Sequence, residues 1–513
     1  MVNNSSKLFK QRLRSIHVSV GIVFSLFIYI SIFFGIFAIY LPYIQIWEKP
    51  SRHFETIKIE NIDYNSMLEP FISNPNFPKN NITIELPGYE NDPALKIIHD
   101  DIKSIVFNPK TKNLIKDEEG KSELAVFLNH MHYGRPYKPF GYILFGLVAI
   151  AVMFLIIGGI LQSIFLKYKS RAKNKQAKYS KWHRKILIWF FTPFVIITLT
   201  GAVMNIGYIT SDFMTYIASK GQTSKIGDLI NPYLNTPLNI VEKKNDRVPM
   251  IPFKTLIKKA QEINPDVNFY YITLTNWNDS SALARFSGYN SKMPFLNGIY
   301  NEPSVVLSGS SGKLVENIKV LDVHWSKLFV DSIYFLHMLF NIGFIFRSIM
   351  AIIMALCGIA IVFGVMLWLE KKAKKYVNKD MFYHWFEKLS ISIIIGVIPS
   401  TGLIFLLQWI LPFDMEDRLI LQRGLFLIFW LFTLIWAFYR TSSYFAIKEL
   451  LFMGGLFFIL TPLLHFYILK INPFELYLQN SIILNVDISL FIFACILFIF
   501  SYKIPKSRNK LEG

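Results

Sequence analysis

Long apolar segments alternate with polar stretches along this chain, and the alternation predicts its fold class. A helix needs about 20 mostly apolar residues to cross the hydrocarbon core of a bilayer. Segments near this length lie at residues 16–40, 140–165, 186–209, 348–369, 391–411, 420–438, 450–469 and 486–502. The pattern predicts a polytopic α-helical membrane protein with about eight transmembrane helices. The first segment runs into Leu41, Pro42 and Tyr43 without a small-residue cleavage site, so we expect it to stay as an anchor.

Two links between these segments are long and polar enough to fold outside the membrane, at residues 43–139 and 210–347. Both contain a pattern of strand, polar turn and strand, at residues 105–115 and 305–315. In the second link this pattern follows a helical and a strand-like stretch, at residues 252–263 and 269–274. We therefore expect two small α+β domains, inserted after helices 1 and 3.

The segments and links divide the chain into six predicted parts. These are 1–42 (N-terminus and helix 1), 43–139 (first outer domain), 140–209 (helices 2 and 3 with a basic link), 210–347 (second outer domain), 348–385 (helix 4 and a second basic link) and 386–513 (a bundle of the last four helices).

Charge follows the same division and predicts the topology. The chain has 53% hydrophobic residues and a net charge of +19, which in a soluble protein would suggest nucleic acid. Here the basic residues form four clusters beside the apolar segments: Lys7, Lys10, Arg12 and Arg14; Lys167, Lys169, Arg171, Lys173, Lys175, Lys178 and Lys181; Lys371, Lys372, Lys374 and Lys375; and Lys503, Lys506, Arg508 and Lys510. With eight spans all four clusters fall on one side, which the positive-inside rule assigns to the cytoplasm. We expect both termini in the cytoplasm, both long links outside, and no nucleic-acid partner.

Four histidines occupy matching positions in this arrangement. His17 and His183 lie at the cytoplasmic starts of the first and third segments, whereas His132 and His337 precede the second and fourth on the outer side. The chain therefore contains a duplicated unit of basic stretch, histidine, span, long outer link, histidine and span. Histidine ligates metals and haem, so this symmetry predicts two sites, one near each membrane face.

Other candidate residues carry less information. Cys357 and Cys495 fall inside apolar segments far apart in the sequence, and no C-x-x-C-H pattern is present, so we expect neither a disulfide nor thioether-linked haem. His53, His99 and His324 are read as surface or structural residues. His465 lies inside the seventh segment, where a polar group is satisfied by a partner helix or marks a pathway.

Several stretches resemble the PepSY-associated transmembrane helix family, which includes iron-regulated inner-membrane ferric-siderophore reductases. The resemblance is carried by Arg14-Ser15-Ile16-His17 leading to Gly21, by Phe127 to Arg135 with its histidine pair, by Trp182-His183-Arg184 followed by Thr192-Pro193-Phe194 and Leu199-Thr200-Gly201-Ala202, and by Leu336-His337-Met338 with Gly358, Gly364 and Leu367 to Lys372. These stretches cover the chain to about residue 375, in the order and with the loops that the family shows.

The resemblance implies that the outer domains are PepSY-like and that the histidines are axial ligands of two non-covalent b-type haems. Helices that face each other would pair His17 with His183 and His132 with His337. His130 is the alternative to His132, and Arg347 is a candidate partner for a haem propionate. The implied activity is transfer of electrons across a bacterial inner membrane to ferric iron, with a ferric siderophore as substrate.

The donor and two other function classes stay open at this point. No dinucleotide-binding or Walker-type motif is found, so electrons would come from quinol, a reduced flavin or a redox protein. Eight spans with a duplicated half also suit a siderophore or chelate permease without haem, in which the histidines would line a proton or metal route. A third reading is a membrane-anchored PepSY protein that binds or regulates other proteins in the outer compartment.

Overall fold

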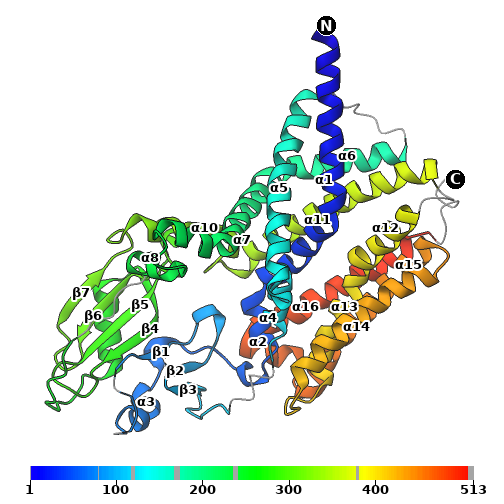
Figure 1. Cartoon of the computed structure of the whole chain (residues 1–513). Coiled ribbons are helices and arrows are strands. Elements are labelled where there is room, and N and C mark those ends of the chain that lie inside the picture. Colours follow the sequence, from blue (N-terminus) through cyan, green and yellow to red (C-terminus); the bar gives the residue numbers. More distant parts are fainter. Residues whose placement is uncertain are drawn as a thin grey trace.

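The computed structural model describes residues 2–74, 76–78, 80–116, 122–166, 174–234, 241–376 and 381–505. In Figure 1 a β-sheet lies at one end of a group of helices, on the side away from the N-terminus, and a second helical bundle packs beside this group. The basic residues predicted to mark the cytoplasmic side at 167–173, and those at 506–510, lie outside the described residues.

Eight helices of the duplicated half form or adjoin its predicted spans, and three shorter helices are given with the sheet below. The eight are α1 (Val2–Ile39), α2 (Leu41–Trp47), α4 (Leu124–His132), α5 (Phe140–Phe165), α6 (Lys175–Trp189), α7 (Phe191–Ala218), α10 (Trp325–Met338) and α11 (Phe344–Tyr376). Within the described part of the chain, seven helices are long and apolar enough to cross a membrane, and the bent pair α6 and α7 makes an eighth if it is counted as one span. This agrees with about eight predicted spans and places the protein in a lipid bilayer.

The third predicted span is broken rather than straight. Helices α6 and α7 meet at Phe190 with a bend of 77°. Pro193, in the first turn of α7, has no backbone N–H and its ring opposes a helix that continues from the preceding turn. As a result α6 runs antiparallel along α11, where Gln176 lies beside Glu370 and Tyr179 stacks on Phe363.

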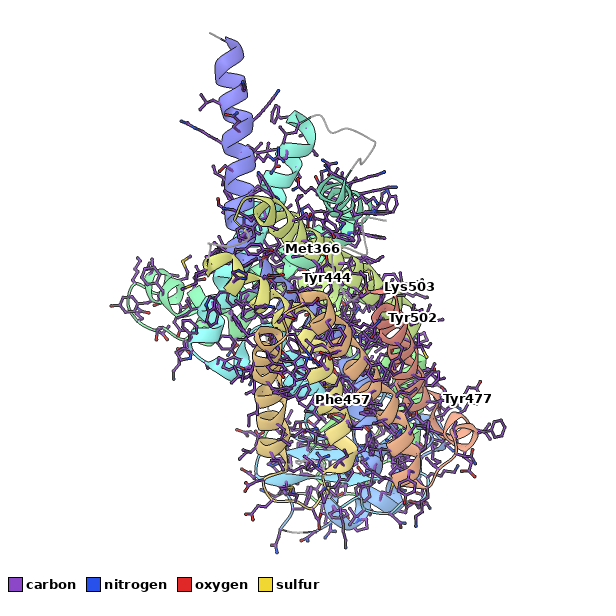
Figure 2. All side chains as sticks on the ribbon, turned by 90° about the vertical axis from the view of Figure 1, so that its right-hand side faces the viewer. Met366, Tyr444, Phe457, Tyr477, Tyr502 and Lys503 are labelled. Carbon is purple, nitrogen blue, oxygen red and sulfur yellow. The ribbon has the colours of Figure 1, made fainter. Side chains whose placement is uncertain are left out.

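The last four predicted spans form a bundle of their own. It contains α12 (Met381–Ile391), which continues through a π-helical turn (Ser392–Gly396) into α13 (Val397–Ile410), followed by α14 (Arg418–Tyr439), α15 (Ser443–Leu469) and α16 (Pro473–Lys503). Reciprocal hydrogen bonds between Asn472 and Glu475 cap the start of α16. Figure 2 shows these helices side by side, with Tyr477 and Tyr502 among the side chains that project outward. The apolar outer surface is what lipid contact requires.

The two outer segments share one antiparallel sheet. Its strands are β1 (Ile82–Glu85), β2 (Leu95–His99), β3 (Ile102–Phe107), β4 (Val267–Thr275), β5 (Leu283–Asn290), β6 (Ser304–Ser308) and β7 (Leu314–Ile318), in the order β3-β2-β1-β4-β5-β6-β7. Strand β1 of the first segment pairs with β4 of the second, and Ile84 opposes Ile272. The expectation of two separate α+β domains is therefore corrected, because both outer segments contribute strands to a single domain.

One hydrophobic core confirms that this outer domain is a single unit. Helices α3 (Tyr64–Ile72) and α9 (Phe253–Ile263) come from different segments, and both pack against the sheet. Leu68 of α3 and Leu256 of α9 are fully buried in this core with Ile84 and Ile272. The predicted hairpin at 305–315 is present as β6 and β7, whereas in the first segment β3 is followed by a turn and a single bridge from Phe107 to Leu114. A short helix, α8 (Ile226–Leu234), lies between α7 and α9.

Candidate functional site

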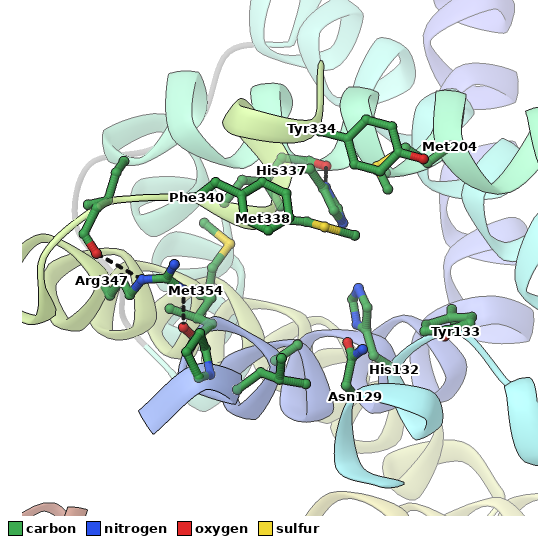
Figure 3. A pocket seen from close by; sticks show the side chains of 18 of the residues that line it. Asn129, His132, Tyr133, Met204, Tyr334, His337, Met338, Phe340, Arg347 and Met354 are labelled. Carbon is green, nitrogen blue, oxygen red and sulfur yellow. Dashed lines mark hydrogen bonds between the residues drawn. The ribbon is translucent and has the colours of Figure 1, made fainter. Parts of the chain in front are cut away.

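The structure brings His132 and His337 together on the side of the sheet, which the sequence predicts to be the outer one. His132 ends α4 and His337 lies in the last turn of α10, so the two rings come from the two copies of the duplicated unit. Their ring centroids are 6.0 Å apart and the ring planes differ by 31°. In Figure 3 the two side chains point toward each other from opposite walls of a cavity. We call them the outer pair.

Hydrogen bonds orient both rings of the outer pair. The Nδ1–H of His132 donates to the carbonyl oxygen of Ser31 at 2.6 Å, and the Nδ1–H of His337 donates to that of Ile197 at 3.0 Å. Burial lowers the pKa of both side chains, and for His337, where the neighbouring His132 adds to the effect, the pKa falls to about 4. Both imidazoles are therefore neutral near pH 7, with the Nε2 lone pair available to a metal, an arrangement common among metal-binding histidines.

Each ring of the outer pair also lies against a glycine of a neighbouring helix. A Cβ built on Gly35 of α1 would come within 3.0 Å of the His132 ring. At Gly201 of α7 it would come within 2.6 Å of Cε1 of His337, closer than real Cβ contacts come. The missing side chains are what allow the rings to approach these helices.

His17 and His183 form a second pair, which we call the inner pair. His17 lies on α1 and His183 on α6, with ring centroids 6.5 Å apart and ring planes at 72°. The Nδ1–H of His183 donates to the carbonyl oxygen of Ala360 at 2.7 Å, whereas Nδ1 of His17 is buried without a hydrogen-bond partner. Glycines again face the rings: a Cβ on Gly158 or on Gly364 would lie 3.3 Å from His17 or His183, respectively.

The spacing of these contacts repeats between the two copies. Gly35 follows His17 by 18 residues, and Gly201 follows His183 by the same number. Gly158 follows His132 by 26 residues and Gly364 follows His337 by 27. In each copy, the first span, which is bent into α6 and α7 in the second copy, therefore carries an inner histidine and the glycine that the outer histidine contacts. The outer histidine precedes the second spanning helix of the copy, and a glycine of that helix contacts the inner histidine.

The outer pair lines a cavity of about 780 Å³ that the sheet helps to enclose. The helical walls include Ser31, Gly35 and Gly201, and the sheet contributes Tyr270 of β4 and Tyr289 of β5. The hydroxyl of Tyr270 donates to Oδ1 of Asn341 in the loop after α10, which ties the sheet to the helices beside the pair. The cavity thus reaches from the membrane helices to the outer domain.

Comparison with known protein families gives a match that covers most of the chain. The family described as PepSY-associated TM region matches residues 14–371. The chain belongs to this family. A comparison with curated proteins gave no match. The PepSY-associated TM region includes both histidine pairs, all four facing glycines and the shared sheet, and it ends before the C-terminal bundle begins at Met381.

Arg347 lines the same cavity of the PepSY-associated TM region but is held by backbone carbonyls. It is 5% exposed and donates to the carbonyl oxygens of Ile39, Leu339 and Ile342, at 2.6, 2.6 and 3.0 Å. These three bonds close the turn between α10 and α11 and fasten it to α1. Since a guanidinium has five N–H donors, a role toward a propionate stays a prediction alongside this structural one.

The two histidines of α4 have different surroundings. His132 faces His337, whereas the ring of His130 lies 5.9 Å from that of Tyr133 in an edge-on contact. Of the two alternatives, His132 is the one that the structure brings to the outer pair. Gly35 and Gly158 were not recognised from the sequence, although the equal spacing of 18 residues from His17 to Gly35 and from His183 to Gly201 would have indicated Gly35.

Proposed function

We propose that the protein transfers electrons across a bacterial cytoplasmic membrane through two b-type haems, one held by each histidine pair, and reduces ferric iron in a siderophore in the outer compartment. The observation that carries the proposal is the geometry of the pairs. Two imidazoles on opposite sides of one metal ion, each with a metal–nitrogen bond of about 2 Å, have ring centroids about 6 Å apart. The observed separations are 6.0 and 6.5 Å.

The surroundings of the pairs fit the same group. Glycines rather than larger side chains face the rings, and in the outer pair both Nδ1 atoms are already used, which leaves Nε2 for iron. A bound b-type haem supplies a one-electron iron centre, and two histidine ligands leave no open iron position for oxygen. The chain's own residues hold and orient this centre, and the cavity of about 780 Å³ offers the space at the outer pair.

The two pairs are placed for transfer across the bilayer. Helix α1 carries His17 of the inner pair and, 14 and 18 residues later, Ser31 and Gly35 that contact His132. At a rise of about 1.5 Å per residue this separates the two sites by roughly 21–27 Å along the helix. That distance is comparable with the hydrocarbon thickness of about 30 Å, so one pair lies near each face.

The outer cavity supports an exit for electrons on the side of the sheet. With haems bound, the inner pair would hold the haem that takes electrons from quinol, a reduced flavin or a redox protein, and the outer pair would hold the haem that gives them up, one electron for each Fe(III) chelate converted to its Fe(II) form. The Fe(II) ion is a poorer match than Fe(III) for hard oxygen donors, so reduction labilises the iron. The sheet tyrosines that wall the outer cavity are where a chelate from the outer compartment would approach the pair.

The test is a haem count on the detergent-purified protein expressed with adequate haem supply. Oxidised and dithionite-reduced spectra with pyridine-haemochrome quantification should give two low-spin b-type haems per chain. His132→Ala and His17→Ala should each lose one haem, and His132→Ala in vesicles with an internal electron donor should lose reduction of an external ferric chelate. His384→Ala, an exposed residue of α12, is the matched control and should keep both haems.

Two results would overturn the proposal. Protein without haem would leave the permease as the leading function. If His132→Ala still reduces the external chelate, electrons do not leave the protein at the outer pair. His130→Ala separates the alternatives on α4, because it should retain both haems if His132 is the ligand.

A further inference from the structure

Another pair of histidines meets where the C-terminal bundle packs against the duplicated half. His465 lies on α15 and is completely buried, and His53 follows α2 in the first outer segment. Their ring centroids are 5.3 Å apart and the ring planes are at 78°. Of the two alternatives expected for His465, a partner helix is observed at one ring nitrogen, because Asp487 of α16 accepts from Nδ1–H. His53 was expected to be a surface or structural residue, and its contact with His465 was not predicted.

Hydrogen bonds fix one nitrogen of each ring and leave the other unused. The Nδ1–H of His465 donates to the Asp487 carboxylate at 2.9 Å, and this carboxylate also accepts from Nε1–H of Trp47 at 2.9 Å. The Nε2–H of His53 donates to the carbonyl oxygen of Trp47 at 3.1 Å. Nε2 of His465 and Nδ1 of His53 are buried without a partner. Carboxylate and carbonyl acceptors behind two imidazoles are the usual support of metal-binding histidines.

The space around this pair excludes a haem. Trp409 stacks on His465 with ring centroids 4.3 Å apart, and the Trp47 ring lies 5.5 Å from His465. Both tryptophans are almost completely buried. Glycines face the histidines of the outer and inner pairs, whereas here indole rings fill the corresponding space. The tryptophans therefore leave no room for a macrocycle, and only a ligand as small as an ion could lie between the two rings.

Ligand number and charge select the kind of ion. Among the described residues no group of three or more His, Cys, Asp or Glu side chains is arranged to hold a metal, which disfavours Zn²⁺ with its four ligands and cations that need many oxygens. Asp487 is 2% exposed, and among the described residues the titratable side chain within ion-pair distance of its carboxylate is His465, which carries no charge when only Nδ1 is protonated. A monovalent cation on the histidines would balance this buried carboxylate. Copper(I) is a monovalent d¹⁰ ion that accepts two imidazole ligands.

We propose that Nδ1 of His53 and Nε2 of His465 bind one copper(I) ion at the junction of the two halves. The site is independent of the haem pairs, so its presence does not depend on the function proposed above. The bound ion would link the outer segment directly to α15, across a boundary that also contains the ion pair of Glu123 with Arg423 of α14.

The test is copper binding by the full-length protein in detergent. Protein is incubated with copper(I) under reducing, anaerobic conditions with a chromogenic copper(I) chelator as competitor, desalted and analysed for metal. Wild type should retain one copper per chain, and X-ray absorption should show two nitrogen ligands. His53→Ala and His465→Ala should each retain none, whereas the control His384→Ala should retain one.

Three outcomes would refute the site. Wild type that holds no more copper than His53→Ala would indicate that a buried water, accepting from Trp409 Nε1–H and donating to both imidazoles, fills the gap. Stoichiometric zinc in place of copper would refute a monovalent ion. Equal copper loss in His384→Ala would show unspecific binding. His53→Ala leaves the bond between His465 and Asp487 intact, so it carries the test if His465→Ala does not fold.

Discussion

The outer and inner pairs use the same ligands in different surroundings. In the outer pair both Nδ1 atoms are bonded to backbone carbonyls, the ring planes differ by 31°, and the sheet helps to enclose the cavity. In the inner pair the planes are at 72°, and His17 has no hydrogen bond at Nδ1. The duplicated unit therefore supplies ligands and glycines twice, but hydrogen bonds orient both rings of the outer pair and only His183 of the inner pair. This difference predicts that the outer site tolerates substitution less than the inner site does.

The largest effect is expected for Gly201→Ala. A Cβ at this position would lie 2.6 Å from Cε1 of His337, so the ring must leave its position and the outer haem should be lost completely. The measurement is the haem count per chain, which should fall from two to one. Gly207→Ala on the same helix has nothing within 4 Å of its new Cβ and should keep both haems. Two haems in Gly201→Ala would show that the outer ring is not held as described.

Arg347→Lys is the next largest change, and it also affects only the outer side. Lysine keeps the charge but cannot reach three carbonyls in a fixed fork, so the turn before α11 loses at least two buried charge-assisted hydrogen bonds. We expect a loss of about 3–6 kcal/mol in stability, from roughly 1.5–3 kcal/mol for each of two hydrogen bonds to a charged group. Thermal unfolding in detergent measures it. Unchanged stability with a shifted outer haem potential would instead favour the propionate role.

Gly158→Ala makes the same kind of substitution at the inner pair as Gly201→Ala makes at the outer pair, because each adds a methyl group that faces a histidine ring. Its new Cβ would lie 3.3 Å from Nδ1 of His17, a distance that a shift of a few tenths of an ångström relieves, and no hydrogen bond at that atom resists the shift. The inner haem should be retained with an altered low-spin electron paramagnetic resonance signal. Gly159→Ala, at 3.9 Å from the same ring, should leave that signal unchanged. Loss of the inner haem would remove the contrast between the pairs.

The smallest effect is expected for Thr200→Val. The Thr200 hydroxyl lies 3.2 Å from Nδ1 of His337, in addition to the carbonyl oxygen of Ile197 at 3.0 Å, so removing it leaves the main hydrogen bond in place. A single hydrogen bond of about 0.5–1.5 kcal/mol corresponds to a shift of roughly 20–60 mV in a one-electron potential. A redox titration should show this shift for one haem only. Thr210→Val, whose hydroxyl donates to Ile206 on the same helix, should show none.

Much of this architecture could be predicted from local sequence patterns. Apolar length determines whether a segment can span a bilayer, and the duplicated order of basic stretch, histidine and span was enough to predict that His17 would face His183 and His132 would face His337. The bend at Phe190 also had a signal in Pro193, but this proline was read only as part of a family motif. A proline inside an apolar segment is tolerated in membrane helices, so its presence alone did not predict a break.

Contacts between distant segments could not be predicted in the same way. The pairing of β1 with β4 joins residues almost two hundred positions apart, and strand patterns give the face of a residue but not its partner strand. The contact of His53 with His465 likewise depends on how the C-terminal bundle packs. An acidic residue inside an apolar segment was the available clue, since Asp487 had to find a partner within the membrane helices.

The pairing of β1 with β4 also determines when the outer domain can finish folding during synthesis. Strand β1 leaves the ribosome long before β4, so during synthesis the first three strands form a half-sheet whose hydrogen-bonding edge at Ile82 to Glu85 has no neighbour. That edge stays open while α5, α6 and α7 are inserted, and only the second outer segment closes it. Nascent chains stopped before residue 267 should therefore be the form of this protein most prone to aggregation and most dependent on chaperones outside the membrane.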